Sequence, residues 1–175
     1  AVNRLATVIR KSLELDNVLQ TAANEVGRAL NVHSCTVRVD GALVGHQMTK
    51  YYLRPDVIGD EMEASLLSDI DSISSRLSES PKAYVVDGDN SQATPVLPDA
   101  VVPLIYEENL IGLVLVRSDD MSRVWADNEL LLLHTVADQL AVVVPLLTHI
   151  VAAANVSDHV NHATIEQSQP RTRKG

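Results

Sequence analysis

The chain has very few aromatic residues and only one cysteine. Its 175 residues include no Phe, one Trp and four Tyr. Platforms that stack nucleic-acid bases or large planar cofactors are built from such side chains, so we expect neither here. The single cysteine, Cys35, excludes an internal disulfide framework and any metal site that needs several thiolates. So low a cysteine content fits a reducing compartment, and we expect a cytoplasmic protein.

Positive charge is also scarce. The formal net charge is -9 at pH 7, and a surface this acidic repels the phosphate backbone, so we expect no direct binding to nucleic acid. The basic ending at Arg171, Arg173 and Lys174 is a solvated tail.

Long apolar runs are missing as well. No run approaches the roughly 20 residues that cross a bilayer, and we expect no membrane insertion. The most apolar stretch, residues 130–154, is interrupted by Asp138, Gln139, Pro145 and His149. The chain begins with Ala, and no signal-peptide pattern follows. We therefore expect it to be a segment of a longer protein.

Hydrophobic periodicity predicts helices at both ends and a sheet between them. A stripe with spacings of three and four runs through residues 2–30, with a break near residues 13–16 because Asp16 is a good N-cap. Alternation over residues 33–39 predicts a strand with Cys35, Val37 and Val39 on one face. The turn Asp40-Gly41 predicts a hairpin, with a returning strand at about residues 43–53.

The second half of the chain continues this pattern. A helical face follows Met62 (Leu66, Ile70, Ile73 and Leu77) and Pro81 ends it. Strands are predicted over residues 83–86, 100–106 and 110–117, the last two joined by Glu107, Glu108 and Asn109, and a long helix begins near Asp127. The predicted fold class is α+β: a central, mainly antiparallel sheet with the N- and C-terminal helices packed on one face.

Several segments resemble a known family. Five segments are similar to the C-terminal half of GAF domains, especially those of sensor histidine kinases and of phytochrome- or ethylene-receptor-like proteins. They are residues 102–104 (Val-Pro-Leu), 109–114 (Asn-Leu-Ile-Gly-Leu-Val), 123–125 (Arg-Val-Trp), 128–133 (Asn-Glu-Leu-Leu-Leu-Leu) and 136–141 (Val-Ala-Asp-Gln-Leu-Ala). Residues 15–20 and 35–39 resemble the opening of the same fold. The resemblance implies three parts: an N-terminal linker or dimer helix at 1–14, a GAF domain at 15–154 and a polar linker or tail at 155–175.

The resemblance also implies a function. Such a domain is a non-catalytic sensory or regulatory part of a larger bacterial signalling protein, here of the two-component type. Bilin-binding members use a cysteine in a later helix or loop, whereas Cys35 lies in the first predicted strand, so we expect no covalent bilin. The cyclic-nucleotide pattern of related domains contains Phe, which this chain lacks, and a GAF-type methionine sulfoxide reductase needs several cysteines. The cofactor therefore stays unknown.

Candidate chemistry outside that resemblance is sparse. The histidines at 33, 134 and 149 are the candidates for a haem ligand, but no pocket pattern surrounds them. His159 and His162, with Asp158, have a spacing that fits a metal on one helical face, yet they lie in the polar tail. No phosphate-binding loop, zinc-protease motif or nucleophile elbow is present, so we expect no enzyme activity in this segment.

Two functions follow as hypotheses. In the first, the domain binds a small molecule in a pocket floored by the sheet and roofed by residues 41–99, where Tyr51, Tyr52, Tyr84 and Asp87 are the candidate lining residues. In the second, it is a ligand-free dimerisation module with a structural role.

The C-terminal helix carries the evidence for dimerisation. One apolar row has three-four spacing, and a second row runs beside it (Leu132, Val136, Val143, Leu146 and Ile150). A helix on a sheet needs one such face, so the doubled row predicts a homodimer. The alternative is that both rows are buried within one monomer. The predicted interface residues are Leu133, Leu140, Val144, Leu147 and Val151. Pro145 is expected to kink the helix, where ligand-driven strain would change its angle.

Overall fold

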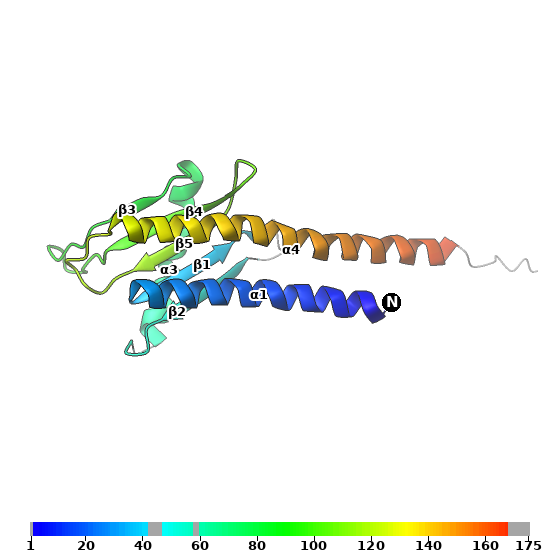
Figure 1. The fold of residues 1–175 in the computed structure, drawn as a ribbon, viewed down its shortest axis with the longest axis horizontal. Coiled ribbons are helices and arrows are strands. Elements are labelled where there is room, and N and C mark those ends of the chain that lie inside the picture. Colours follow the sequence, from blue (N-terminus) through cyan, green and yellow to red (C-terminus); the bar gives the residue numbers. More distant parts are fainter. Residues whose placement is uncertain (1, 42–46, 58–59, 168–175) are drawn as a thin grey trace, which may run out of the picture.

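The computed structural model describes residues 2–41, 47–57 and 60–167 (Figure 1). Helix α1 spans Val2–Leu30, α3 spans Asp60–Glu79 and α4 spans Asp127–Gln167. The strands are β1 (Ser34–Val39), β2 (Met48–Leu53), β3 (Tyr84–Val86), β4 (Asp99–Tyr106) and β5 (Asn109–Arg117). The predicted order of elements is confirmed, but α1 continues without a break past Asp16.

The five strands form one sheet in the order β2-β1-β5-β4-β3, and every neighbouring pair is antiparallel. Helices α1 and α4 lie side by side against one face of this sheet (Figure 1). Helix α3 lies on the opposite face, where Ile70 and Leu77 pack on Val101, Leu113 and Leu115. The predicted α+β class, with the terminal helices on one face, is therefore confirmed.

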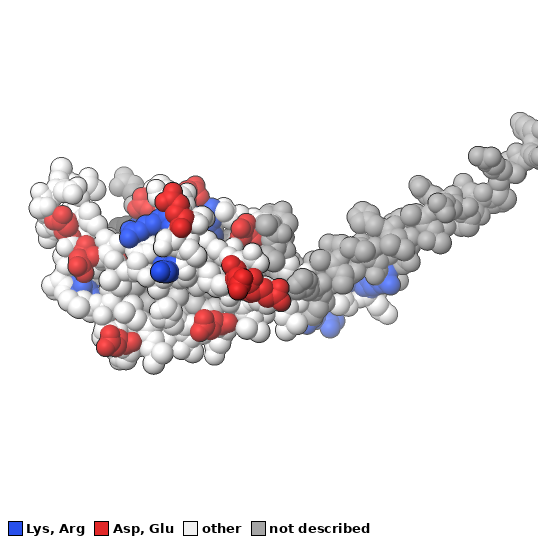
Figure 2. Space-filling view, turned by 90° about the horizontal axis from the view of Figure 1, so that it is seen from above, with Lys and Arg blue, Asp and Glu red and all other residues white. Residues whose placement is uncertain are grey.

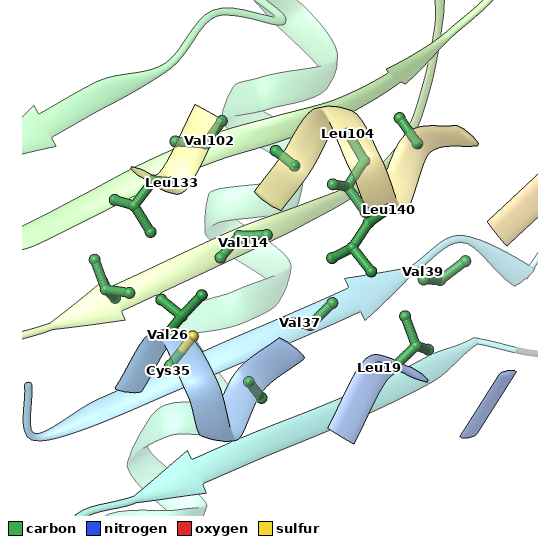
Figure 3. Packing of buried hydrophobic residues seen from close by; sticks show 14 of the residues in the cluster. Leu19, Val26, Cys35, Val37, Val39, Val102, Leu104, Val114, Leu133 and Leu140 are labelled. Atoms are coloured by element: carbon green, nitrogen blue, oxygen red, sulfur yellow. The ribbon is translucent and has the colours of Figure 1, made fainter. Parts of the chain in front are cut away.

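The main core fills the space between the sheet and the two terminal helices (Figure 3). Its side chains are aliphatic, which is why a chain without Phe can still fold. The inward face of β1 is the one predicted from its alternation: Cys35, Val37 and Val39 are fully buried. Facing them are residues of α1, α4, β4 and β5, among them Leu19, Val26, Val102, Leu104, Val114, Leu133 and Leu140.

The two hairpins differ in their connections. Strands β4 and β5 are joined by a two-residue turn, because Tyr106 pairs with Asn109. Strands β1 and β2 are not joined by the tight Asp40-Gly41 turn that the sequence predicts: Val39 pairs with Met48, so the connection spans residues 40–47. A tight turn would have paired Val39 with a residue three positions on. The proposed strand residues 43–46 lie outside the described part of the chain.

The terminal helices project past the sheet on the same side (Figure 1). Helix α4 continues through Pro145 to Gln167, so the polar segment after residue 155 is helical over its first part. By length and mean hydropathy, residues 127–148 of α4 could cross a membrane, a test that core helices of soluble proteins also pass. Here the segment packs on the sheet through Leu133, Ala137 and Leu140.

Candidate functional site

Helix α3 is fixed over the sheet by both apolar and charged contacts. The guanidinium of Arg76 lies 3.8 Å from the ring centre of Tyr84 on β3. Arg117 on β5 reaches Asp69 at 3.4 Å, and Arg38 on β1 reaches Asp71 at 2.8 Å. These contacts hold one face of α3 at a set height above β1 and β5, and that height determines the space beneath the helix.

Strand β1 presents a polar row to this space. Ser34, Thr36 and Arg38 alternate with the apolar core residues, yet they are buried too, because α3 and its flanking segments cover this face. Among the described residues, the hydroxyls of Ser34 and Thr36 and the Nε and Nη1 atoms of Arg38 have no hydrogen-bond partner. Buried polar groups in folded proteins are almost always paired, so an unpaired row marks a candidate binding site.

A cavity of about 140 Å³ lies at one end of this row. Arg38 lines it from the sheet, and Ser74 and Ser78 line it from α3, one helical turn apart. The space continues over Gly112, where a Cβ atom would collide with the carbonyl oxygen of Arg38. Asp40, Gln47, Leu110 and Leu113 complete the lining.

Arg117, on the same face of the sheet, shows how this environment satisfies a guanidinium. Its Nε and Nη2 donate to the two carboxylate oxygens of Asp99, at 2.8 and 2.9 Å, in a buried fork. Burial alone would lower the pKa of Arg117, but the hydrogen bonds and charge of Asp99 raise it overall. Arg38 has no such fork: among the described residues only its Nη2 has a partner, Asp71, whose side chain is exposed.

The residues predicted to line a ligand pocket do not line this cavity. Tyr52 faces the other side of the sheet, because it pairs with Cys35 and packs against the main core. Tyr84 packs against α3 and Val101, beside the second core. Tyr51 and Asp87 are also absent from the lining. Sequence reasoning named none of the residues that line this cavity, and it missed Arg38 because a polar residue that alternates with apolar ones along a strand resembles an ordinary solvated position.

A second candidate surface lies between the terminal helices. An open groove of about 410 Å³ separates α1 from α4 on the side away from the sheet, with a mainly apolar lining. Val18 and Ala22 line it from α1, and Val136 and Val143 line it from α4. These two α4 residues belong to the second apolar row of that helix. Leu146, in the same row, is 59% exposed.

The residues predicted for the dimer interface lie mainly beneath this surface, although Leu140 also lines the groove. Leu133, Leu140, Val144 and Leu147 are buried in the core of a single chain, against the sheet and α1. The side chain of Val151 lies outside the described residues. Because these side chains are largely covered within one chain, a contact between copies through them stays a prediction. The first row packs inside the monomer, and the second is only partly covered.

The remaining candidates from the sequence lie in unconnected places. Cys35 is fully buried, and burial raises the pKa of its thiol to about 12. His33 is buried at the start of β1, while His134 is exposed on α4. Where side chains are described, no three His, Cys, Asp or Glu residues cluster as metal ligands would. The side chains of His149, His159 and His162 lie outside that part.

Acidic side chains are spread over the surface rather than gathered at one site. On the face seen in Figure 2 they are interspersed with basic ones, and no patch of a single sign stands out. The charge of the chain therefore gives no second binding surface on this face.

Solved structures with the same fold come from signalling proteins. The blue-light absorbing form of the PixJ GAF domain from Thermosynechococcus elongatus is 13% identical, with a TM-score of 0.56 over 85% of this chain and 95% of that one. The phycocyanobilin-bound GAF domain of a cyanobacterial phytochrome is 16% identical, with a TM-score of 0.55 over 84% and 96%. A GAF domain/HD domain protein from Geobacter sulfurreducens is 13% identical, with a TM-score of 0.53 over 74% and 91%.

These identities are low, so the likeness concerns the fold. No curated protein matches the chain. The sequence profile of the GAF domain matches residues 14–144, which covers the sheet, α3 and the parts of α1 and α4 that pack on them. The chain belongs to the GAF domain family.

Proposed function

We propose that this GAF domain is the cytoplasmic sensory and relay part of a larger bacterial signalling protein of the two-component type, and that it works as a homodimer. GAF domains are regulatory rather than catalytic, and this one has two separate surfaces that suit that role. The cavity under α3 would receive a small molecule. The outer side of α1 and α4 would join a second copy and pass the signal along the projecting helices.

The observation that carries the proposal is the uncovered apolar surface of the terminal helices. Apolar groups exposed in a row on paired helices are typical of helix-bundle interfaces. On α4, Val142 and Leu146 are 63% and 59% exposed, and Leu146 lies about one turn beyond Val143 of the groove lining. On the projecting part of α1, Leu5, Ile9 and Leu13 are exposed as well. A second copy that laid the same helices into this groove would cover both sets in one four-helix arrangement.

Sedimentation equilibrium at micromolar concentration tests the assembly. Thr21→Lys plus Leu146→Lys places charges at two exposed positions beside the groove, and we expect it to shift a dimeric wild type to monomer. A matched control, Val85→Lys plus Val124→Lys, makes the same change at exposed positions on β3 and in the loop before α4, and should stay dimeric. A monomeric wild type, or equal dissociation of both variants, would contradict the proposal. Charges at Leu140 and Leu147 would instead test folding, because both are buried.

The alternative function is a ligand-free dimerisation module. It predicts the same sedimentation result but no bound molecule. Native mass spectrometry of freshly purified protein distinguishes the two, since a sensory domain with an occupied cavity would carry extra mass that is lost on denaturation. The unpaired polar row beneath α3 favours the sensory function, because a purely structural module gains nothing from burying polar groups without partners.

A further inference from the structure

We propose that the cavity beneath α3 binds a small carboxylate, with the Arg38 guanidinium as the group that recognises it. This inference rests on the proposed sensory function and names the chemical class of its ligand. It depends on three features of the described residues: an incompletely paired buried cation, a neighbouring space, and a lining that limits the charge of the occupant.

The first feature is the state of Arg38. Its residue is 7% exposed, and a buried charged group is costly unless it is paired and hydrogen-bonded. Nη2 donates to Asp71 at 2.8 Å, but Nε and Nη1 have no acceptor among the described residues. Its cross-strand neighbours, Thr49 on β2 and Leu113 on β5, carry no negative charge. A carboxylate supplies acceptor oxygens, which are what the free N–H groups lack.

The comparison with Arg117 shows that this is not a general property of the sheet face. Arg117 also points to the α3 side from a central strand, and Asp99 of the neighbouring strand accepts two of its hydrogen bonds. The fold thus provides an internal carboxylate for one guanidinium, whereas the other lies beside a cavity and has donors without an acceptor among the described residues. We infer that a carboxylate from outside the chain takes the place at Arg38 that Asp99 takes at Arg117.

The second feature is the space. The cavity of about 140 Å³ has room for a molecule of several heavy atoms, well beyond a single water. The backbone of Gly112 forms part of its lining on the sheet side. Ser74 and Ser78 line the α3 side, and Leu110 and Leu113 offer an apolar wall. This combination suits a short aliphatic chain that ends in a polar head.

The third feature limits the charge. Asp40 also lines the cavity, and Asp71 already occupies one nitrogen of Arg38. A phosphate dianion would add two negative charges beside these carboxylates, and like charges at short range oppose such binding. A single carboxylate adds one. The lining therefore favours a small monocarboxylate over a phosphate compound.

Nuclear magnetic resonance of the arginine Nε–H groups tests the proposal directly. Butyrate serves as the probe, titrated at constant ionic strength against sodium chloride, with n-butanol as its uncharged counterpart and inorganic phosphate as the competing anion. We expect a saturable shift of the Arg38 Nε–H resonance with butyrate alone, while the resonance of Arg117 stays in place. Arg38→Gln should weaken binding about tenfold to a hundredfold, the range for a lost charged hydrogen bond.

Two further variants separate binding from folding and from bulk charge. Arg28→Gln removes one exposed positive charge on α1, away from the cavity, and should bind butyrate as the wild type does. Ser74→Leu fills the cavity while Arg38 remains, and should weaken binding as strongly as Arg38→Gln. A shift that does not saturate, equal movement of Arg117, tighter binding of phosphate, or unchanged affinity in Arg38→Gln would each overturn the proposal. Were native mass spectrometry to find a retained neutral molecule instead, the sensory function would stand and the carboxylate inference would fail.

Discussion

The turn between β4 and β5 gives a prediction whose magnitude follows from the backbone. Glu107 and Glu108 have φ angles of 48° and 67°, and the two-residue loop between paired strands has the pattern of a type I′ turn, in which both central residues have positive φ. For residues other than Gly and Asn this conformation costs roughly 1–2 kcal/mol each. Asn-Gly is the pair that this turn favours.

The double substitution Glu107→Asn plus Glu108→Gly should therefore stabilise the domain. Relief of strain at two positions is offset by about 0.5–1 kcal/mol of additional chain entropy in the unfolded state for Gly, which leaves a net gain of about 1–3.5 kcal/mol. For a domain of this size that gain corresponds to a rise in Tm of roughly 2–14 °C, measurable by circular dichroism. The matched control is Glu107→Gln plus Glu108→Gln, which removes the same two charges but keeps side chains that disfavour positive φ. An equal rise in the control, or none in the Asn-Gly variant, would refute the backbone explanation.

Two more predictions concern buried titratable groups on β1 and just before it. Cys35 should react with a thiol reagent roughly a hundredfold or more slowly in the native protein than in the denatured chain, because burial raises the pKa of its thiol to about 12 and access requires opening of the core; native labelling at the denatured rate would contradict this. Burial also lowers the pKa of His33 below its ordinary value of 6.5, with the Asp119 charge opposing this shift. Between the two pKa values, His33 binds a proton in the unfolded chain but not in the folded chain. The free energy of unfolding should therefore fall as the pH drops below about 6.5, and it should stop falling once the pH is below the folded-state pKa of His33. Urea denaturation at pH 7.5 and 5.5 should show a smaller loss in His33→Asn than in the wild type, and an equal loss in both would show that other groups cause it.

Much of the fold could be predicted because periodicity reports which faces are buried. The stripe on α1 identified its packed part, since Leu15, Leu19 and Val26 are all buried. The boundary between β4 and β5 was also correct, even though Glu107-Glu108 lacks the Gly that usually marks such a turn. Apolar runs on both sides of a short polar segment sufficed there.

The candidate site could not be predicted in the same way, because the signal depends on what covers a polar face. Alternation along β1 separates Cys35 and Val37 from Thr36 and Arg38, but it does not say whether the second set meets water or another layer. A central strand of a sheet covered on both faces buries both sets, and only the position of α3 reveals this. The same limit applies to α4, where two apolar rows were visible but the sequence could not show which one the monomer itself would bury.

The position of Arg38 also gives a physical route between the two proposed surfaces. Strand β1 is a central strand with Arg38 on its α3 face and its neighbours Val37 and Val39 on the other, in the core formed with α1 and α4. At Gly112, β5 approaches the backbone of Arg38 so closely that no Cβ atom fits between them. Protein cores are close-packed and transmit displacements instead of absorbing them. A ligand that draws the Arg38 side chain into the cavity would therefore move β1, which packs on α1, together with β5, which contacts α4. We expect the angle between α1 and α4 to be the quantity that changes.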